Sequence, residues 1–376
     1  MIQFTYKIKL ECSIMKKFTG FEHGMGIGGW LTNYKRFNVL PQDRRLCLTI
    51  GDMEHFATYI TEQDVEYIKS LDMDHIRLGF DQIVFEYEPY LYREEIFRIV
   101  DSFISWCKKH NVNVVLNLHK AIGNYCDIAE KVQLLDDNEL QNRFIALWVA
   151  FEKRYSNDNS IAFELLNEVR NVDPDKWNLL ADKTINEIRK LNKLRKIILG
   201  STCWNSPDTL KDLKIYDDEN IIYTFHTYDP FEFTHQRGVL QEEPLYYNRK
   251  MPYPCDIERY RDYQRVVRGD LEAYKEYEKM DMAYIRDALQ GAVDFTKEHP
   301  DKILWCGEFG TIRHADIKWR ENWMRDVITV LKENDIPYCV WNYLSTPNDG
   351  NRFSLVDDDH RKILSDEMAK IIKGQL

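Results

Sequence analysis

The sequence predicts an α/β protein, a (β/α)8 TIM barrel with a partly helical insertion subdomain after the sixth strand. Short apolar runs alternate with amphipathic helical stretches along most of the chain, and 376 residues suffice for one barrel plus an insertion. Several runs are apolar almost without interruption, as parallel strands buried on both faces should be. We expect residues 1–376 to form a single domain.

Eight strand candidates follow one another along the chain: Met25–Leu31, His75–Phe80, Val112–Leu118, Ile161–Asn167, Lys196–Gly200, Ile221–His226, Ile303–Glu308 and Tyr338–Asn342. Apolar residues at helical spacing predict helices at Glu94–Lys109, Asn138–Arg154, Asp175–Leu191, Met280–Lys297, Lys318–Asn334 and Lys362–Lys373. Thr61 followed by Asp64 resembles a capping box and predicts a further helix before the second strand.

The segment between Tyr228 and about Met280 departs from this alternation. It contains no strand–helix unit, and a loop of that length without secondary structure would be unusual in a compact domain. We therefore expect residues 229–280 to form a small, partly helical insertion subdomain. Because βα loops emerge at the C-terminal ends of barrel strands, we expect it to lie over that face. Its aromatic residues are numerous: Phe231, Phe233, Tyr246, Tyr247, Tyr253, Tyr260, Tyr263, Tyr274 and Tyr277.

Composition limits the compartment and the partners. A net charge of −11 argues against a nucleic-acid partner, which would require a basic face. The eight cysteines form no CxxC pair, which suits a reducing compartment better than a disulfide scaffold. Lys7, Lys9 and Glu11 stand where a secretory signal would need an uninterrupted apolar region, and no stretch approaches the length of a membrane span. We expect a cytoplasmic monomer with no membrane partner.

Polar side chains accumulate at the expected C-terminal ends of the strands. The second to fourth strands contribute Arg77, His119, Asn167 and Glu168, and the sixth to eighth contribute His226, Tyr228, Glu308 and Trp341. Polar groups at the tips of otherwise apolar strands are typical of a functional site, whereas the strand interiors form the core.

Two carboxylates on distant strands, Glu168 and Glu308, are what hydrolysis of a sugar acetal requires. One protonates the departing oxygen while the other meets the anomeric carbon. For a lone strand-end Glu a structural salt bridge is the usual alternative, and the adjacent Asn167 favours catalysis here. Asn167 can donate to a sugar hydroxyl beside the anomeric centre, and Tyr228 can position the nucleophile.

Tryptophans supply the candidate sugar-stacking surfaces. Trp341 offers a flat apolar face to the C–H side of a pyranose ring. Trp30 and Trp204 are further candidates for substrate binding, with core packing as the alternative for each. His119 and His226 could likewise be core histidines, although their places at strand ends favour a site role.

The whole pattern resembles glycoside hydrolase family 5, the cellulase family of clan A, over roughly Gly24–Tyr343. That family carries an Arg on strand two, a His on strand three, an Asn-Glu pair after strand four, His-x-Tyr on strand six, a Glu on strand seven and a Trp on strand eight. All eight positions are matched here, at the residues named above. Gly28–Leu31 and Phe56–Asp64 resemble the branch that holds clostridial endoglucanase C and the exo-β-1,3-glucanases.

The resemblance implies a retaining double displacement, with Glu308 as nucleophile and Glu168 as acid and then base. The two carboxyl groups should then lie ~5–5.5 Å apart. The resemblance also implies that Arg77, His119, Asn167, His226, Tyr228 and Trp341 bind substrate or support the two carboxylates, with no metal and no organic cofactor. Lys120 and Ile122 depart from the pattern of close relatives beside the glycone side of the cleft, which leaves the sugar preference there open.

We expect an endo-acting hydrolase of β-1,4- or mixed-linkage β-1,3-1,4-glucan, of the cellulase or lichenase type, acting on a polysaccharide or oligosaccharide. The alternatives within the family are an exo-β-1,3-glucanase, a mannanase or an oligosaccharide β-glucosidase. A catalytically silent carbohydrate-binding barrel is the alternative from another class, and the presence of both Glu residues argues against it.

Overall fold

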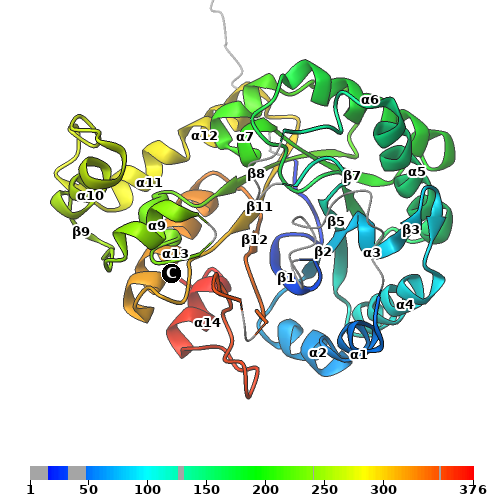
Figure 1. Cartoon of the computed structure of the whole chain (residues 1–376), viewed down its shortest axis with the longest axis horizontal. Helices are drawn as coiled ribbons and strands as arrows, with labels where there is room; N and C mark the ends of the chain where they lie inside the picture. The colour runs from blue at the N-terminus through cyan, green and yellow to red at the C-terminus, as the bar shows by residue number, and fades with distance from the viewer. Residues whose placement is uncertain (1–15, 33–47, 126–130, 240, 347–348) are drawn as a thin grey trace, which may run out of the picture.

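The computed structural model describes residues 16–32, 48–125, 131–239, 241–346 and 349–376, and within them eight parallel strands close into a barrel (Figure 1). This confirms the predicted (β/α)8 fold. The strands of the barrel are β1 (His23–Leu31), β2 (His75–Asp81), β5 (Asn113–Lys120), β6 (Ile161–Glu164), β7 (Lys196–Gly200), β8 (Ile221–Thr227), β11 (Ile303–Phe309) and β12 (Tyr338–Val340). All eight expected strands are present, and β6 and β12 end earlier than expected.

The predicted helices lie outside the ring of strands (Figure 1). They are α2 (Glu62–Ser70), α4 (Glu94–Lys109), α5 (Asn138–Tyr155), α6 (Pro174–Leu191), α13 (Ile317–Glu333) and α14 (Asp366–Ile372). The capping box of α2 is confirmed, since the Thr61 N–H donates to Asp64 Oδ2 at 2.8 Å. The stretch expected as one helix at Met280–Lys297 is two, α11 (Met282–Ala288) and α12 (Gln290–Glu298), separated at Leu289, whose φ of −98° and ψ of 4° depart from helical values.

One end of the barrel interior is filled by apolar side chains. Phe18 and Phe21, just before β1, stack with their ring centroids 4.4 Å apart, and Trp305 of β11 meets Phe18 edge-on at 6.1 Å. These rings pack against inward-facing side chains of the neighbouring strands: Val115, Ala162, Ile198, Ile222, Ile303 and Cys339. This end of the barrel interior is therefore largely apolar, and the buried ring of His75 packs there against Phe21 and Trp305 at 5.5 and 5.7 Å.

The insertion is partly helical, as expected. It contains α8 (Phe231–Thr234), α9 (Glu242–Tyr247), α10 (Glu258–Tyr263) and a single π turn at Gln264–Arg268, with β9 (Cys255–Asp256) paired to β10 (Lys279–Met280). In Figure 1, α9, β9 and α10 lie to one side of the barrel, next to α11 and α13. The hydroxyl of Tyr253 donates to Asp326 of α13 at 2.7 Å. Most of the insertion therefore flanks the barrel, and α8 is the part that directly follows β8.

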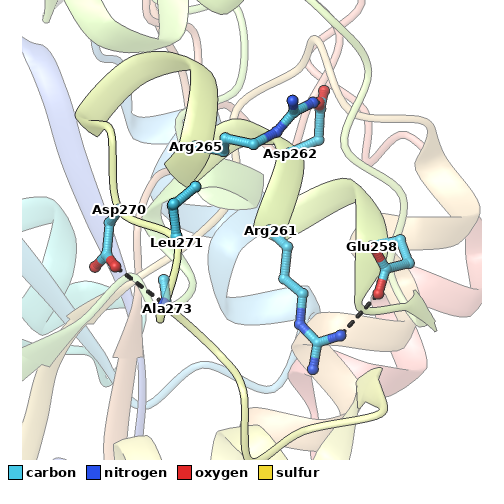
Figure 2. A pocket seen from close by; sticks show the side chains of 7 residues that line it. All are labelled: Glu258, Arg261, Asp262, Arg265, Asp270, Leu271 and Ala273. Carbon is cyan, nitrogen blue, oxygen red and sulfur yellow. Dashed lines mark hydrogen bonds and ion pairs between the residues drawn. The ribbon is translucent and has the colours of Figure 1, made fainter.

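The tyrosines of the insertion mainly form its own core. Tyr253, Tyr260 and Tyr263 are fully buried. A hollow of about 380 Å³ on the insertion is lined by Glu258, Arg261, Asp262, Arg265, Asp270, Leu271 and Ala273 (Figure 2). Its arginines are neutralised within it, because Arg261 pairs with Glu258 at 2.7 Å and Arg265 with Asp262 at 2.6 Å. None of the helices in the described ranges has the length and apolar content that a membrane span requires.

Candidate active site

Strand register brings the two carboxylates together. Glu308 of β11 pairs with His226 of β8, and Glu168 follows the end of β6, across the barrel. One carboxylate oxygen of Glu168, one of Glu308 and a ring nitrogen of His226 all lie within 4.8 Å of one another. The side chain of Glu308 is 7% exposed and that of Glu168 is 16% exposed, so both are largely buried but reach solvent.

A buried arginine binds one carboxylate oxygen of Glu308. Arg77 of β2 has no exposed surface, and its Nη1 donates to Glu308 Oε2 at 2.6 Å. Its Nε and Nη2 donate to the two oxygens of Glu164, at 2.7 and 2.8 Å. Burial by itself would lower the pKa of Arg77, but the charges of Glu164 and Glu308 outweigh it and raise the pKa. Arg77 therefore stays cationic between two carboxylates.

Glu164 is a further residue of this site that the strand-end pattern does not predict. It lies in the apolar run of β6, where a carboxylate between buried neighbours is the signal that could have identified it. Its side chain is completely buried, and a buried charge needs a partner. Arg77 supplies that partner, so Glu164 fixes the guanidinium in the orientation that also binds Glu308.

The second oxygen of Glu308 is bound by a tyrosine. The hydroxyl of Tyr228, which follows β8, donates to Glu308 Oε1 at 2.5 Å. Burial and the charge of Glu308 raise the pKa of Tyr228 well above its ordinary value, so the phenol remains a neutral donor. With one donor on each oxygen, the carboxylate of Glu308 is fixed in one orientation.

Glu168 has a different partner. Nδ1 of His226 lies 2.9 Å from Glu168 Oε1. Burial lowers the pKa of His226 to about 4, even though the charge of Glu308 opposes this shift. The imidazole is therefore neutral at neutral pH, and it meets Glu168 as a hydrogen-bond partner without a net charge.

The remaining predicted site residues extend this network. Arg77 Nη2 donates to Asn167 Oδ1 at 2.5 Å, and Asn167 Nδ2 lies 3.5 Å from His119 Nε2. The ring of His119 stacks on Trp341 with centroids 5.4 Å apart and planes 14° apart. Burial, and then the charge of Arg77, lower the pKa of His119 well below its ordinary value, so this ring is also neutral. Trp341 is 9% exposed, and its contact with a sugar stays a prediction.

The expectation that Trp30 contacts substrate is wrong. Its side chain is 1% exposed, its indole Nε1 donates to the carbonyl of Phe56 at 2.8 Å, and its ring packs edge-on against Phe103 of α4. The cause is Gly29, whose φ of +72° interrupts the alternation of β1, and the register with β2 shifts between Ile27 and Leu31. Trp30 is thereby turned outward into the core between strands and helices.

Trp204 lies on a left-handed turn after β7. Cys203, Trp204 and Asn205 have φ values of 54°, 57° and 59°, which cost non-glycine residues about 1–2 kcal/mol each. Such strain persists where surrounding contacts over-determine it, and it is frequent at functional sites. Trp204 is 41% exposed, and Asn205, beside it, is completely buried. Sugar stacking on Trp204 stays a prediction.

Glu168, His226 and Glu308 are the group of described residues that could hold a metal ion. Their surroundings do not favour one. Both oxygens of Glu308 already accept hydrogen bonds, and one of these comes from the guanidinium of Arg77 at 2.6 Å. A fixed cation at that distance would repel a divalent ion strongly in a site of low polarity. The arrangement is suited instead to one fixed carboxylate facing a second, partly exposed one.

A buried histidine beside the site predicts a stability change with pH. The ring of His235 stacks on Phe231 with centroids 4.2 Å apart, and burial lowers the pKa of His235 to about 3. Between pH 6.5 and about 3, His235 is protonated in the unfolded chain but neutral in the folded protein. The free energy of unfolding therefore falls as the pH falls through this range. Urea unfolding from pH 7 to 4 should show a shallower pH dependence for His235→Gln, by up to about one proton. An unchanged slope would contradict this assignment.

Comparisons with known proteins identify relatives of this chain. The family model "Cellulase (glycosyl hydrolase family 5)" matches residues 43–346. Endoglucanase C of Acetivibrio thermocellus is 35% identical over 359 residues, which cover 94% of this chain and 98% of that protein. Cellodextrinase A of Ruminococcus flavefaciens is 27% identical over 327 residues, covering 86% and 85%. Among solved structures, Thermotoga maritima Cel5A in complex with cellobiose has a TM-score of 0.70 and 23% identity, with 94% of this chain and 97% of that chain covered, which supports the fold.

Proposed function

Because this chain belongs to glycoside hydrolase family 5, the cellulase family, we propose that it is a retaining, endo-acting β-glucanase. Its substrate would be β-1,4-linked or mixed-linkage β-1,3-1,4-glucan. The observation that carries the mechanism is the approach of Glu168 and Glu308, since one carboxylate oxygen of each lies within 4.8 Å of the other. Retaining enzymes hold the two carboxyl groups ~5–5.5 Å apart, whereas inverting enzymes leave ~6.5–9.5 Å for a water molecule.

In the first step, an oxygen of Glu308 attacks the anomeric carbon while Glu168 gives its proton to the glycosidic oxygen. The bond between the anomeric carbon and that oxygen breaks, the leaving sugar departs neutral, and a glycosyl ester of Glu308 forms. Arg77 and Tyr228 hold Glu308 in the attacking orientation before the step. The carboxylate of Glu308 is therefore oriented before the reaction begins, so little entropy has to be lost in reaching the transition state.

In the second step, Glu168 is a carboxylate and takes a proton from water as the water attacks the anomeric carbon. The ester bond to Glu308 breaks, and two inversions leave the configuration unchanged. Neutral His226 beside Glu168 suits both roles, because it adds no charge that would favour only one protonation state.

Similarity to Endoglucanase C supports endo action, and similarity to Cellodextrinase A makes short chains the second candidate substrate. Product analysis distinguishes the two. An endo enzyme lowers the viscosity of barley β-glucan or carboxymethylcellulose before much reducing sugar is released. An enzyme of short chains would leave the viscosity unchanged while it cleaves cello-oligosaccharides. NMR of the first products should show the β-anomer, and an α-anomer would refute retention.

Replacing Glu168 by alanine tests its double role. Turnover of β-glucan is expected to fall by roughly 10²–10⁴-fold, the usual contribution of a general acid–base catalyst. With dinitrophenyl β-cellobioside, whose leaving group needs no proton, formation of the glycosyl-enzyme should be almost unaffected. Azide should then accelerate turnover and give the β-glycosyl azide, because this anion needs no base to attack. Equal losses on both substrates would exclude Glu168 as the acid.

Replacing Trp204 by alanine tests the proposed stacking surface. We expect KM on cello-oligosaccharides to rise roughly five-fold, from the loss of about 1 kcal/mol of aromatic contact, with little change in kcat. Tyr246→Ala is the matched control, since Tyr246 is a 73% exposed aromatic residue on the flanking insertion. An equal effect in both variants would show that Trp204 has no specific role.

A further inference from the structure

We propose that Asn205 is a positioning residue that fixes the tautomer of His226, and through it the oxygen of Glu168 that carries the transferable proton. The inference deepens the proposed function and rests on Glu168 acting as the acid. Asn205 lies on the left-handed turn after β7 and faces the neutral imidazole from the side opposite to Glu168.

The orientation of the Asn205 amide is determined by its neighbours. Its Nδ2 lies 2.7 Å from the backbone oxygen of Asn167. Because a carbonyl oxygen can only accept, the atom facing it must be the amide nitrogen. Within the described part of the chain Oδ1 finds no hydrogen-bond partner, so the donor side sets this orientation. The absence of a side chain at Gly200 makes the room, since a Cβ there would lie 2.1 Å from Asn205 Oδ1.

The same amide nitrogen lies 3.3 Å from Nε2 of His226. An amide nitrogen carries two hydrogens, and the first is used by Asn167, so the second points to the imidazole. Nε2 must then present its lone pair, because two N–H groups facing each other would repel. In a neutral imidazole the proton is left on Nδ1, and it is donated to Glu168 Oε1 at 2.9 Å.

A neighbouring carboxylate favours the opposite tautomer. Oε1 of Glu164 lies 3.9 Å from Nε2 of His226, and its negative charge attracts a proton to that nitrogen. The amide of Asn205 lies closer and opposes this. Without Asn205, and while Glu168 is protonated, the charge of Glu164 would favour a proton on Nε2, and Nδ1 would become an acceptor.

The tautomer decides where Glu168 keeps its proton. With the hydrogen on Nδ1, Oε1 of Glu168 must accept, so the acid's proton stays on Oε2 and can pass to the glycosidic oxygen. With the hydrogen on Nε2, Oε1–H would donate to Nδ1, and the proton would point to the histidine. In the working arrangement the imidazole neither gains nor loses a proton during catalysis.

The wild-type enzyme labelled with ¹⁵N-histidine tests the tautomer directly. Long-range ¹H–¹⁵N spectra distinguish a protonated Nδ1 from a protonated Nε2, and the spectrum of His226→Gln identifies the signal. We expect the wild-type signal to show hydrogen on Nδ1 from pH 6 to 8, and Asn205→Ala to move it to Nε2 at any pH where Glu168 is protonated. Hydrogen on Nε2 in the wild type would overturn the proposal, whether or not the variant folds.

Kinetics of Asn205→Ala supply the second readout. Cleavage of β-glucan, which needs the proton, should slow by about 10–100-fold, part of the contribution of a general acid. Formation of the glycosyl-enzyme from dinitrophenyl β-cellobioside should change by less than about three-fold, since that leaving group needs no proton. Thr209→Val is the matched control, because Thr209 bonds the carbonyls of Thr202 and Ser206 in the same turn without touching His226. An equal slowing on both substrates, or in both variants, would reduce Asn205 to a structural role.

The two proposals can fail separately. Glu168→Ala could slow both substrates equally while His226 carries its hydrogen on Nδ1. The assignment of Glu168 as the acid would then be wrong, and the proposal that Asn205 fixes the tautomer of His226 would stand. If Glu168 behaves as the acid and His226 carries its hydrogen on Nε2, the proposed function stands and the role of Asn205 is refuted.

Discussion

Replacing Glu308 by alanine is expected to lower kcat on barley β-glucan by about 10⁴- to 10⁶-fold, the scale seen when a catalytic nucleophile is removed. The reason is specific to its position. Arg77 and Tyr228 fix both oxygens of Glu308, and among the described carboxylates Glu308 is the one grouped with Glu168 and His226. Reducing-sugar release and single-turnover kinetics would measure the loss.

The same variant reports on the identity of the nucleophile. Azide or formate placed in the space left by Glu308 should restore part of the turnover of an activated β-cellobioside and give a product of inverted configuration, because only one displacement then occurs. Glu298→Ala, an exposed glutamate at the end of α12, is the control and should retain wild-type activity. Near-normal turnover of Glu308→Ala would show that another group attacks the sugar.

Arg77→Met is expected to produce the largest loss of stability. Its guanidinium lies between the buried carboxylates of Glu164 and Glu308, and both would lose their counter-charge. Removing one partner of a buried ion pair typically costs about 3–5 kcal/mol, because the other charge stays buried without compensation. Urea unfolding monitored by circular dichroism should show this as a lower midpoint with a similar slope.

A second buried ion pair serves as the matched control. Arg195 and Glu152 are equally buried and lie 2.7 Å apart, away from the two candidate catalytic carboxylates. Arg195→Met should destabilise by a comparable amount while the folded fraction keeps its kcat, whereas Arg77→Met should lose both. Adding Glu164→Gln to Arg77→Met should recover part of the stability, since one uncompensated charge is removed. Full stability of Arg77→Met alone would contradict the role assigned to this cluster.

Much of the fold could be predicted because barrel strands are buried on both faces. Their apolar runs can be recognised without knowledge of their partners, and all eight were located. Apolar runs do not mark where a strand ends. The strand expected at Ile161–Asn167 is β6, which ends at Glu164, three residues before Asn167. The placement of the insertion could not be derived, because it depends on contacts such as Tyr253 with Asp326, which lie far apart in sequence.

The site residues likewise divide into those that the sequence predicts and those that it does not. The structure brings Glu168, Glu308, Arg77, His226 and Tyr228 together because strand order and the tips of parallel strands suffice to place them. The prediction for Trp30 is wrong because Gly29, with its positive φ, reverses the side of the strand on which the next side chain lies. The alternation of inward and outward residues along a strand cannot reveal this.

Asn205 could not be identified from sequence either. It lies in a left-handed turn that nothing in the residue types specifies, and its importance comes from two contacts across the barrel rim. Glu164, by contrast, could have been found, since a carboxylate inside an apolar strand needs a buried cation.

The aromatic floor formed by Phe18, Phe21 and Trp305 has a consequence for the order of events. It closes the N-terminal end of the barrel interior, so in the proposed mechanism the departing chain and the incoming water both pass through the C-terminal end. We therefore expect water to reach the esterified sugar after the cleaved chain has moved aside. In the proposed double displacement, departure of the first product would then precede hydrolysis of the glycosyl-enzyme.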